Sequence, residues 1–320
     1  MYLKTTKEIR VTRERNVFGM ENKKYQIITD GSCDLPQELI QEKGITVVPF
    51  YVSFDGEHYY KEGVEMEVRE FYDKMVADPN TFPKSSLPSV QDYADVFMPF
   101  AAENTAIICI CITTKFSGSM QSALNAKELV LETYPDAKIT VIDATVNTVL
   151  QGLYVLEAVS MQEKNIPYEQ AVAKLEEIKS TGRIFFTIGN MEYLKHGGRI
   201  GKLAGLAGSV LGIKPLITLK EGEIFSSGIT RSRKKSLVKV LDLLDEYLKE
   251  FQVDITDYSL AIGVGYDYEE AKEFKKMLIK FLEERGQKVE DIPLYQIGAA
   301  IGVHTGPYAL GIGIMKRHGL

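Results

Sequence analysis

Three short turns in this sequence carry hydroxyl groups that could together bind an anion. They are Asp30-Gly31-Ser32, Ser85-Ser86 and Ser117-Gly118-Ser119. Each lies at the end of a predicted strand or helix, and ligands of open parallel sheets bind beyond the carboxyl ends of the strands. Hydroxyls and the backbone N–H groups of a helix N-terminus bind an anion without a formal positive charge. Each turn taken alone is also typical of ordinary caps, and we expect Asp30 to shape its loop by binding backbone amides.

His304 is the residue that could make such a site catalytic. It is one of four histidines and lies in VHTGPY, which we interpret as a loop flanked by glycine and proline. A serine hydrolase would use Ser117 as its nucleophile and His304 as its base. The G-x-S-x-G elbow of such enzymes is missing, because Lys115-Phe116 precedes Ser117. A structural, a ligand-binding and a catalytic role for His304 all stay open at this point.

Residues 194–217 read LKHGGRIGKLAGLAGSVLGIKPLI, with glycines recurring among leucines and a few basic residues. The run matches neither the phosphate-binding P-loop nor the dinucleotide motif G-x-G-x-x-G. At about 100° per residue, a helix here would have a bare face and an opposite, bulky apolar face. The two faces would carry Gly201, Gly205, Gly208 and Gly212, and Leu203, Leu206 and Val210. The bare face would accept either a tightly packed helix or a flexible apolar ligand, and this stretch alone favours the helix.

A dense basic run, RSRKK at residues 231–235, stands out in an acidic chain. It begins a predicted amphipathic helix, where the helix dipole disfavours cations. The run is either a solvated surface or a contact for an acidic partner or a phosphate. A third hypothesis for the function is therefore a regulatory or interaction module that uses the basic run as its contact surface.

Composition limits the class of protein further. The 320 residues suggest two domains, and 45% hydrophobic and 26% charged residues are ordinary for a globular protein. A formal net charge of −6 argues against nucleic acid as a partner. Three cysteines do not indicate a disulfide framework, and Cys109 and Cys111 favour a buried strand over a C-x-C metal site. The N-terminus lacks the apolar segment of a signal peptide, so we expect a cytoplasmic protein without metal or cofactor.

The elements that must position these residues alternate between strand and helix, which predicts an α/β fold with a parallel sheet. Strands are expected at 25–29, 45–54, 105–112 and 138–143, helices at 35–44, 68–77, 91–101, 120–134 and 149–164, and a loop at 79–89. A second unit is expected to contain helices at 169–180, 234–251 and 269–286, strands at 183–189 and 258–267, a hairpin at 214–229 and short strands from 293 onward. With a boundary near 160–168, we predict an extension at 1–24 and domains at 25–165 and 166–320.

Several segments together resemble one family. TDGSCDLP, SSLPS, KFSGSMQSA, YLKHGGRIGKLAGLAGSVLGIKPLI and HTGP occur in the order and spacing of the DegV family. Its members are bacterial fatty-acid-binding proteins that serve as binding subunits of fatty acid kinase. The resemblance covers the chain from about Tyr25 onward. It implies an N-terminal three-layer α/β/α domain with a parallel sheet and a C-terminal two-layer α/β domain with a mixed sheet.

The resemblance also implies where the lipid binds. A long-chain fatty acid would lie between the two domains, with its carboxylate held by Ser85 and Ser117 and with His304 in the same polar network. The residues expected to support this site are Asp30, Ser86 and Gly118. Gly205 and Gly208 would contact the acyl chain, in keeping with the bare helix face.

A separate ATP-binding fatty acid kinase subunit would phosphorylate the bound carboxylate, and the acyl phosphate would enter phospholipid synthesis. Arg199 and Arg231 resemble the arginines that serve the contact with that subunit. The chain by itself would then be no enzyme and would have no catalytic residue. The expected partners are the fatty acid and the kinase subunit, and no nucleic acid is expected. Transient contact with a membrane surface is compatible with this role.

The sequence departs from the family pattern at several positions. Ser85 replaces the usual threonine, Leu87 replaces glutamine, and Tyr308 replaces the last glycine of H-x-G-P-G. Asp30-Gly31-Ser32 replaces D-S-S or D-S-T, and the segment ATVNTVLQG at 144–152 lacks the usual serine and glycines. The length and unsaturation of the lipid therefore do not follow from the resemblance.

Overall fold

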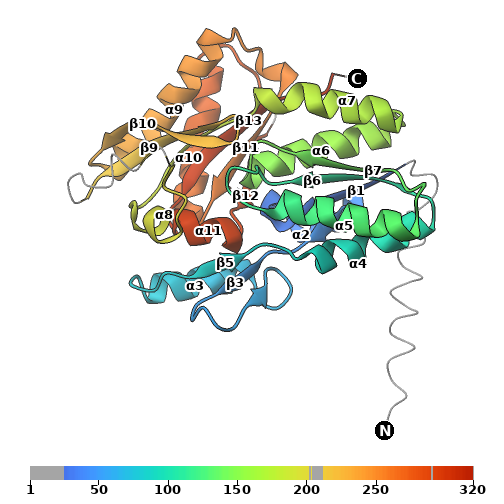
Figure 1. Ribbon diagram of the computed structural model, residues 1–320. Coiled ribbons are helices and arrows are strands. Elements are labelled where there is room, and N and C mark those ends of the chain that lie inside the picture. The colour runs from blue at the N-terminus through green and yellow to red at the C-terminus, as the bar shows by residue number, and fades with distance from the viewer. Residues whose placement is uncertain (1–24, 202, 204–211, 290, 320) are drawn as a thin grey trace.

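The computed structural model describes residues 25–201, 203, 212–289 and 291–319. A four-stranded parallel sheet lies at the centre of the first half of the chain (Figure 1). The strand order is β2-β1-β6-β7, and every pair is parallel. The strands are β1 (Tyr25–Asp30), β2 (Thr46–Val48), β6 (Ala106–Cys111) and β7 (Ile139–Asp143). All residues of β1 and β6 are buried, as their nearly continuous apolar runs predict for a sheet covered on both faces.

Helices cover both faces of this sheet. On one face lie α4 (Val90–Ala102) and α5 (Ser119–Thr133), and on the other lie α2 (Gln37–Lys43), α6 (Thr148–Glu163) and α7 (Tyr168–Ile178). Local signals in the sequence define the ends of two of them. Ser89 caps α4 in a capping box with Asp92, and Gly44 ends α2 in the left-handed conformation.

The second half contains a six-stranded mixed sheet with the order β10-β9-β8-β13-β11-β12. Only the β11–β12 pair is parallel. The strands are β8 (Arg183–Thr187), β9 (Lys214–Lys220), β10 (Glu223–Thr230), β11 (Tyr258–Val264), β12 (Leu294–Gln296) and β13 (Leu310–Lys316). Its outer face packs on α9 (Arg233–Glu250) and α10 (Tyr268–Glu283).

Helix α6 lies between the two sheets and packs against strands of both (Figure 1). Twelve of its 16 residues are buried, as expected for a helix that is apolar on nearly every side. The layers therefore run helix, parallel sheet, helix, mixed sheet, helix. The predicted fold class is confirmed, while the division of the chain at residue 165 stays a prediction.

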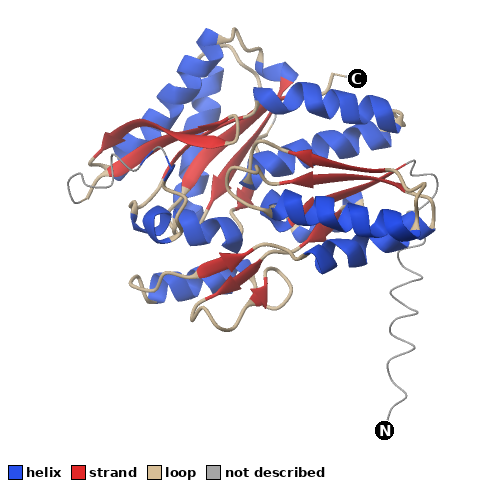
Figure 2. Cartoon of the chain, viewed as in Figure 1, coloured by secondary structure: helices blue, strands red, loops and turns tan. Residues whose placement is uncertain are grey.

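A small third sheet corrects two of the expected elements (Figure 2). Residues 45–54 do not form one strand, because the chain leaves β2 and begins β3 (Tyr51–Ser53) in a different sheet. The break contains Pro49, which has no N–H to donate to a ladder. The expected loop at 79–89 contains β5 (Lys84–Ser86), which pairs with β3, as does β4 (Tyr60–Lys61).

The region after residue 293 is also more helical than predicted. Between β12 and β13 it forms α11 (Ala299–Thr305), which packs with α3 (Val68–Ala77), α8 (Glu192–His196) and the small sheet. At its N-terminus the backbone N–H groups of Ala299 and Ala300 donate to the carboxylate of Glu62. His304 therefore lies in the last turn of a helix, and the expectation of a loop was wrong.

Two of the four glycines of the predicted glycine-faced helix do not have helical backbone angles. Gly201 and Gly212 have φ values of 45° and 85°, in the left-handed region that a right-handed helix does not use. Gly205 and Gly208 lie outside the described residues. Within the described residues, no helix combines the length and apolar character required to cross a membrane.

Candidate functional site

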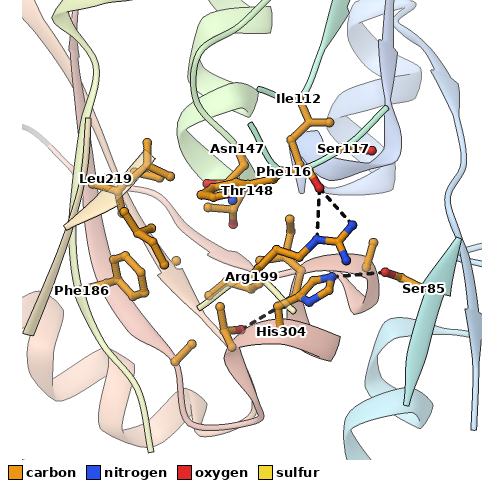
Figure 3. Close-up of a pocket in the computed structure, with 18 of the residues that line it drawn as sticks. Ser85, Ile112, Phe116, Ser117, Asn147, Thr148, Phe186, Arg199, Leu219 and His304 are labelled. Atoms are coloured by element: carbon orange, nitrogen blue, oxygen red, sulfur yellow. Dashed lines mark hydrogen bonds between the residues drawn. The ribbon is translucent and has the colours of Figure 1, made fainter. Parts of the chain in front are cut away.

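A cavity of about 230 Å³ opens between the mixed sheet, α6, α11 and the turn after β6 (Figure 3). A single water needs roughly 10–15 Å³ by a comparable measure, so the cavity has room for a ligand of many atoms. Much of its wall is apolar and comes from both halves of the chain. These residues include Ile112, Val149, Ile184, Phe186, Leu219, Ile224, Ile297 and Leu310.

One end of the cavity is polar. Ser85 in β5, Ser117 in the turn between β6 and α5, and His304 in α11 all line it. The Oγ of Ser85 lies 3.3 Å from Nε2 of His304. The Oγ of Ser117 accepts the backbone N–H of Ser119 at 3.2 Å. The structure thus brings together three residues that are far apart in the sequence, and in the described residues the histidine pairs with Ser85 and not with Ser117.

His304 is held in its neutral form. Burial, together with a smaller effect from the nearby positive charge of Arg199, lowers the pKa of its imidazole to about 4. Its Nδ1 is buried and has no hydrogen-bond partner among the described residues. A Cβ at Gly197 would overlap the ring, so the glycine makes room for it. A neutral imidazole next to the Ser85 hydroxyl can donate or accept a hydrogen bond without adding charge.

Arg199 lines the same end of the cavity. Its Nε and Nη2 each donate to the carbonyl of Phe116 at 3.1 Å (Figure 3). Its Nη1 donates to the carbonyl of Gly197 at 2.9 Å. These bonds tie the chain after α8 to the turn that carries Ser117. In the described residues the guanidinium pairs with carbonyls and with no carboxylate, so its positive charge stays available beside the cavity.

Asp30 stabilises the turns beside this end of the cavity through hydrogen bonds. Its carboxylate accepts the backbone N–H groups of Ser32 at 3.4 Å and of Ile112 at 2.9 Å, which agrees with the expected loop-shaping role. It also accepts from the side chains of Gln151 and Ser119. Burial raises the pKa of Asp30, and these hydrogen bonds oppose that rise. Asp30 is not part of the cavity wall, whereas Ser86, which follows Ser85 in β5, is.

The basic run divides into two parts. Arg233 is half-buried and forms a bidentate pair with Glu270, with Nε–Oε1 and Nη2–Oε2 distances of 2.8 and 2.5 Å. Arg231, Lys234 and Lys235 are exposed. Arg231 lies outside the cavity wall, so the two arginines grouped by the resemblance occupy different surroundings.

The opposite end of the cavity is built on the mixed sheet. Phe186, Gly311 and Gly263 lie in register across β8, β13 and β11. A Cβ at Gly311 would collide with Phe186, and a Cβ at Gly263 would lie 3.3 Å from side-chain atoms of Val149 and of Ile297. The two glycines therefore leave space for the phenylalanine and for the cavity. Sequence reasoning missed them, although alternating glycines in GIGIM and GVGYD were a usable signal.

The cysteines behave as core residues. Cys109 and Cys111 are buried, their sulfurs are 3.8 Å apart, and they pack in the core under α4 and α5. No group of three or more His, Cys, Asp or Glu side chains in the described residues is placed to hold a metal ion.

The fold and the cavity define an α/β protein with two large sheets and one small sheet, and with a largely apolar cavity that ends in hydroxyl, imidazole and guanidinium groups. The chain belongs to the DegV family, because the family model described as "Uncharacterised protein, DegV family" matches residues 24–317.

Curated relatives and solved structures are similar over most of their length. A DegV domain-containing protein of Clostridium perfringens is 30% identical over 91% of this chain and 99% of its own. A stearic acid-binding protein from Eubacterium ventriosum is 46% identical, with a TM-score of 0.87 over 92% of this chain and 99% of that one. A fatty-acid-binding DegV family protein from Thermus thermophilus is 28% identical, with a TM-score of 0.79 and coverage of 91% and 99%.

Proposed function

We propose that this protein binds a long-chain fatty acid in the cavity, with the carboxylate at Ser85, Ser117 and His304 and the acyl chain along the apolar wall. The observation that carries the proposal is an apolar cavity with a Ser85–His304 hydrogen bond at one end. The names of similar structures support it, since those from Eubacterium ventriosum and Thermus thermophilus are described as fatty-acid-binding.

The energetics suit such a ligand. Burying a methylene group contributes about 0.8 kcal/mol, so a chain of about 16 carbons contributes on the order of 10 kcal/mol before the costs of binding. A buried carboxylate is expensive unless it is hydrogen-bonded. The two serine hydroxyls and an imidazole N–H can donate to it, and the Arg199 guanidinium adds an opposite charge.

In the same proposal, this chain by itself catalyses no reaction. The bound carboxylate is presented to a separate ATP-binding kinase subunit in the cytoplasm, and the acyl phosphate feeds phospholipid synthesis. Arg231 suits a contact with that subunit because it is exposed and lies outside the cavity wall. Arg199 is at the cavity end, where it can serve both the carboxylate and the partner. Contacts of Gly205 and Gly208 with the acyl chain remain part of the proposal.

Mass spectrometry tests the ligand. Protein purified from bacteria should carry a fatty acid in native spectra, and delipidated protein should take up added stearic acid. Only the apo mass, without uptake, would contradict the proposal.

The partner is tested separately with delipidated, reloaded protein and a kinase subunit. Arg231→Ala should leave fatty acid affinity unchanged and slow acyl phosphate formation, whereas the neighbouring exposed Lys234→Ala serves as the control. Equal losses in lipid affinity and in phosphorylation would assign Arg231 to the lipid site instead. Hydrolysis of lipid esters by the chain alone, with labelling of Ser117 by an activated phosphonate, would favour the serine hydrolase.

A further inference from the structure

Asn147 places a polar group in the wall of the cavity, between its two ends (Figure 3). The residue immediately precedes α6 at the position where asparagine usually caps a helix. Here its side chain makes no capping hydrogen bond. Within the described part of the chain, no other group forms a hydrogen bond with its side-chain amide. The same cavity is lined by Ile112, Val149 and Phe186, whose apolar side chains offer no hydrogen bond.

The backbone fixes this orientation from both sides. Thr145 and Thr148 have φ values of 55° and 49°, which are strained for β-branched residues. The Thr148 hydroxyl donates to Asp34 at 2.5 Å, and the Thr145 hydroxyl donates to the carbonyl of Ala144 at 2.7 Å. Thr148 is therefore already engaged and does not compete for the cavity. Strain of this kind, held by surrounding bonds, is common where a side chain must be presented to a ligand.

We propose that Asn147 is a second polar binding point and that the ligand is a fatty acid with a hydroxyl group along its chain. This inference rests on the proposed fatty acid binding. A primary amide offers two donors and one acceptor, and a methylene chain beside it satisfies none of them. A hydroxyl group can both donate to and accept from the amide. A site built in this way discriminates against the analogue without the hydroxyl, because that analogue leaves the amide unpaired.

The alternative is that a plain fatty acid binds and that water satisfies the amide. The two alternatives differ in measurable ways. With water as the partner, a hydroxyl group brings no gain at any chain position. With the ligand as the partner, one position of the hydroxyl fits best, because the carboxylate end fixes the distance to Asn147.

The experiment compares stearic acid with a series of positional monohydroxystearic acids on delipidated full-length protein. We expect at least one isomer to bind about tenfold more tightly than stearic acid. In Asn147→Leu this preference should disappear and stearic acid should bind more tightly, since the unpaired amide is gone. Asn125→Leu, on the exposed surface of α5, is the matched control and should keep the wild-type preference.

The outcomes separate this inference from the proposed function. If stearic acid binds and no isomer is preferred in the wild type, the inference fails and fatty acid binding stands. If neither stearic acid nor any isomer binds, the proposed function fails first. The wild-type series alone decides the first point, so the test does not depend on the folding of Asn147→Leu.

Discussion

The two ends of the cavity are built in different ways. The polar end joins Ser85, Ser117 and His304 from a small sheet, a turn and a short helix, which meet only because the chain folds back over long distances. The apolar end is a single row, Phe186–Gly311–Gly263, set by strand register. A hydrogen-bonded end discriminates by chemical group, whereas an apolar end discriminates by size. Substitutions at the first should affect all fatty acids alike, and those at the second should depend on chain length.

The largest effect is expected at the polar end. Ser117→Ala removes the proposed donor to the carboxylate. A hydrogen bond to a charged group typically contributes about 1.5–3 kcal/mol, so affinity should fall roughly 10- to 150-fold. The loss should be the same for laurate and stearate in calorimetric titrations. The exposed strand residue Ser226 provides the control, and Ser226→Ala should bind as the wild type does. A loss of affinity that grows with the length of the acyl chain would contradict the proposed difference between the two ends of the cavity.

Filling the space at Gly263 should have the next largest effect. Gly263→Val places methyl groups against Val149 and Ile297, which lie 3.3 Å from the position of a Cβ. Stearate affinity should fall by about tenfold, in line with the roughly 1–3 kcal/mol that overpacking costs. Laurate affinity should change little. Equal losses for both acids would indicate that this glycine serves packing of the protein alone.

Shortening Phe186 should shift the preferred length by a smaller amount. Phe186→Leu lengthens the apolar end, and each additional buried methylene contributes about 0.8 kcal/mol, or roughly fourfold in affinity. The ratio of affinities for an acid two carbons longer than stearate, relative to stearate, should therefore rise. A competition assay with equimolar acids measures this ratio directly. An unchanged ratio would place the end of the acyl chain elsewhere.

The smallest expected effect is on the pH dependence of stability. Burial raises the pKa of Glu62 to about 7 from 4.5, so its contribution to stability is lost as pH rises between these values. Burial lowers the pKa of His304 to about 4 from 6.5, so its contribution is lost as pH falls between these values. The two contributions have opposite slopes in the same range and largely offset each other.

Single variants should separate these slopes in urea unfolding from pH 4 to 7. Glu62→Gln should make stability rise more steeply with pH than in the wild type, because only the His304 contribution remains. His304→Gln should make stability fall with rising pH. Identical profiles for both variants would mean that neither group titrates as its burial implies.

Local signals account for the elements that the sequence predicted well. The start of α4 follows from the Ser89 capping box, and β1 and β6 follow from short buried apolar runs. The errors at residues 45–54 and 79–89 have a common cause. Strands β3 and β5 contain three residues each and exist because they pair with each other across a long stretch of chain. Periodicity carries no information on such a pairing.

The site shows the same limit. Ser85, Ser117 and His304 were identified as residues, and the family resemblance grouped them, but no local pattern placed His304 on a helix between glycines. Asn147 was not singled out, since a polar residue before a helix normally predicts a cap. The alternating glycines around Gly263 and Gly311 are visible in the sequence, but that these two glycines lie side by side follows only from the pairing of β11 with β13.

Strand β13 also has a consequence for folding. It follows every other strand of the mixed sheet along the chain, yet it lies between β8 and β11 in space. Until it is synthesised, β10-β9-β8 and β11-β12 are separate pieces, each with an unpaired edge that can pair with another molecule. Joining them is a late, long-range step, and such steps are slow. The nascent chain is therefore most prone to aggregate shortly before residues 310–316 become available for pairing. By then most of its apolar surface has been synthesised but is not yet buried.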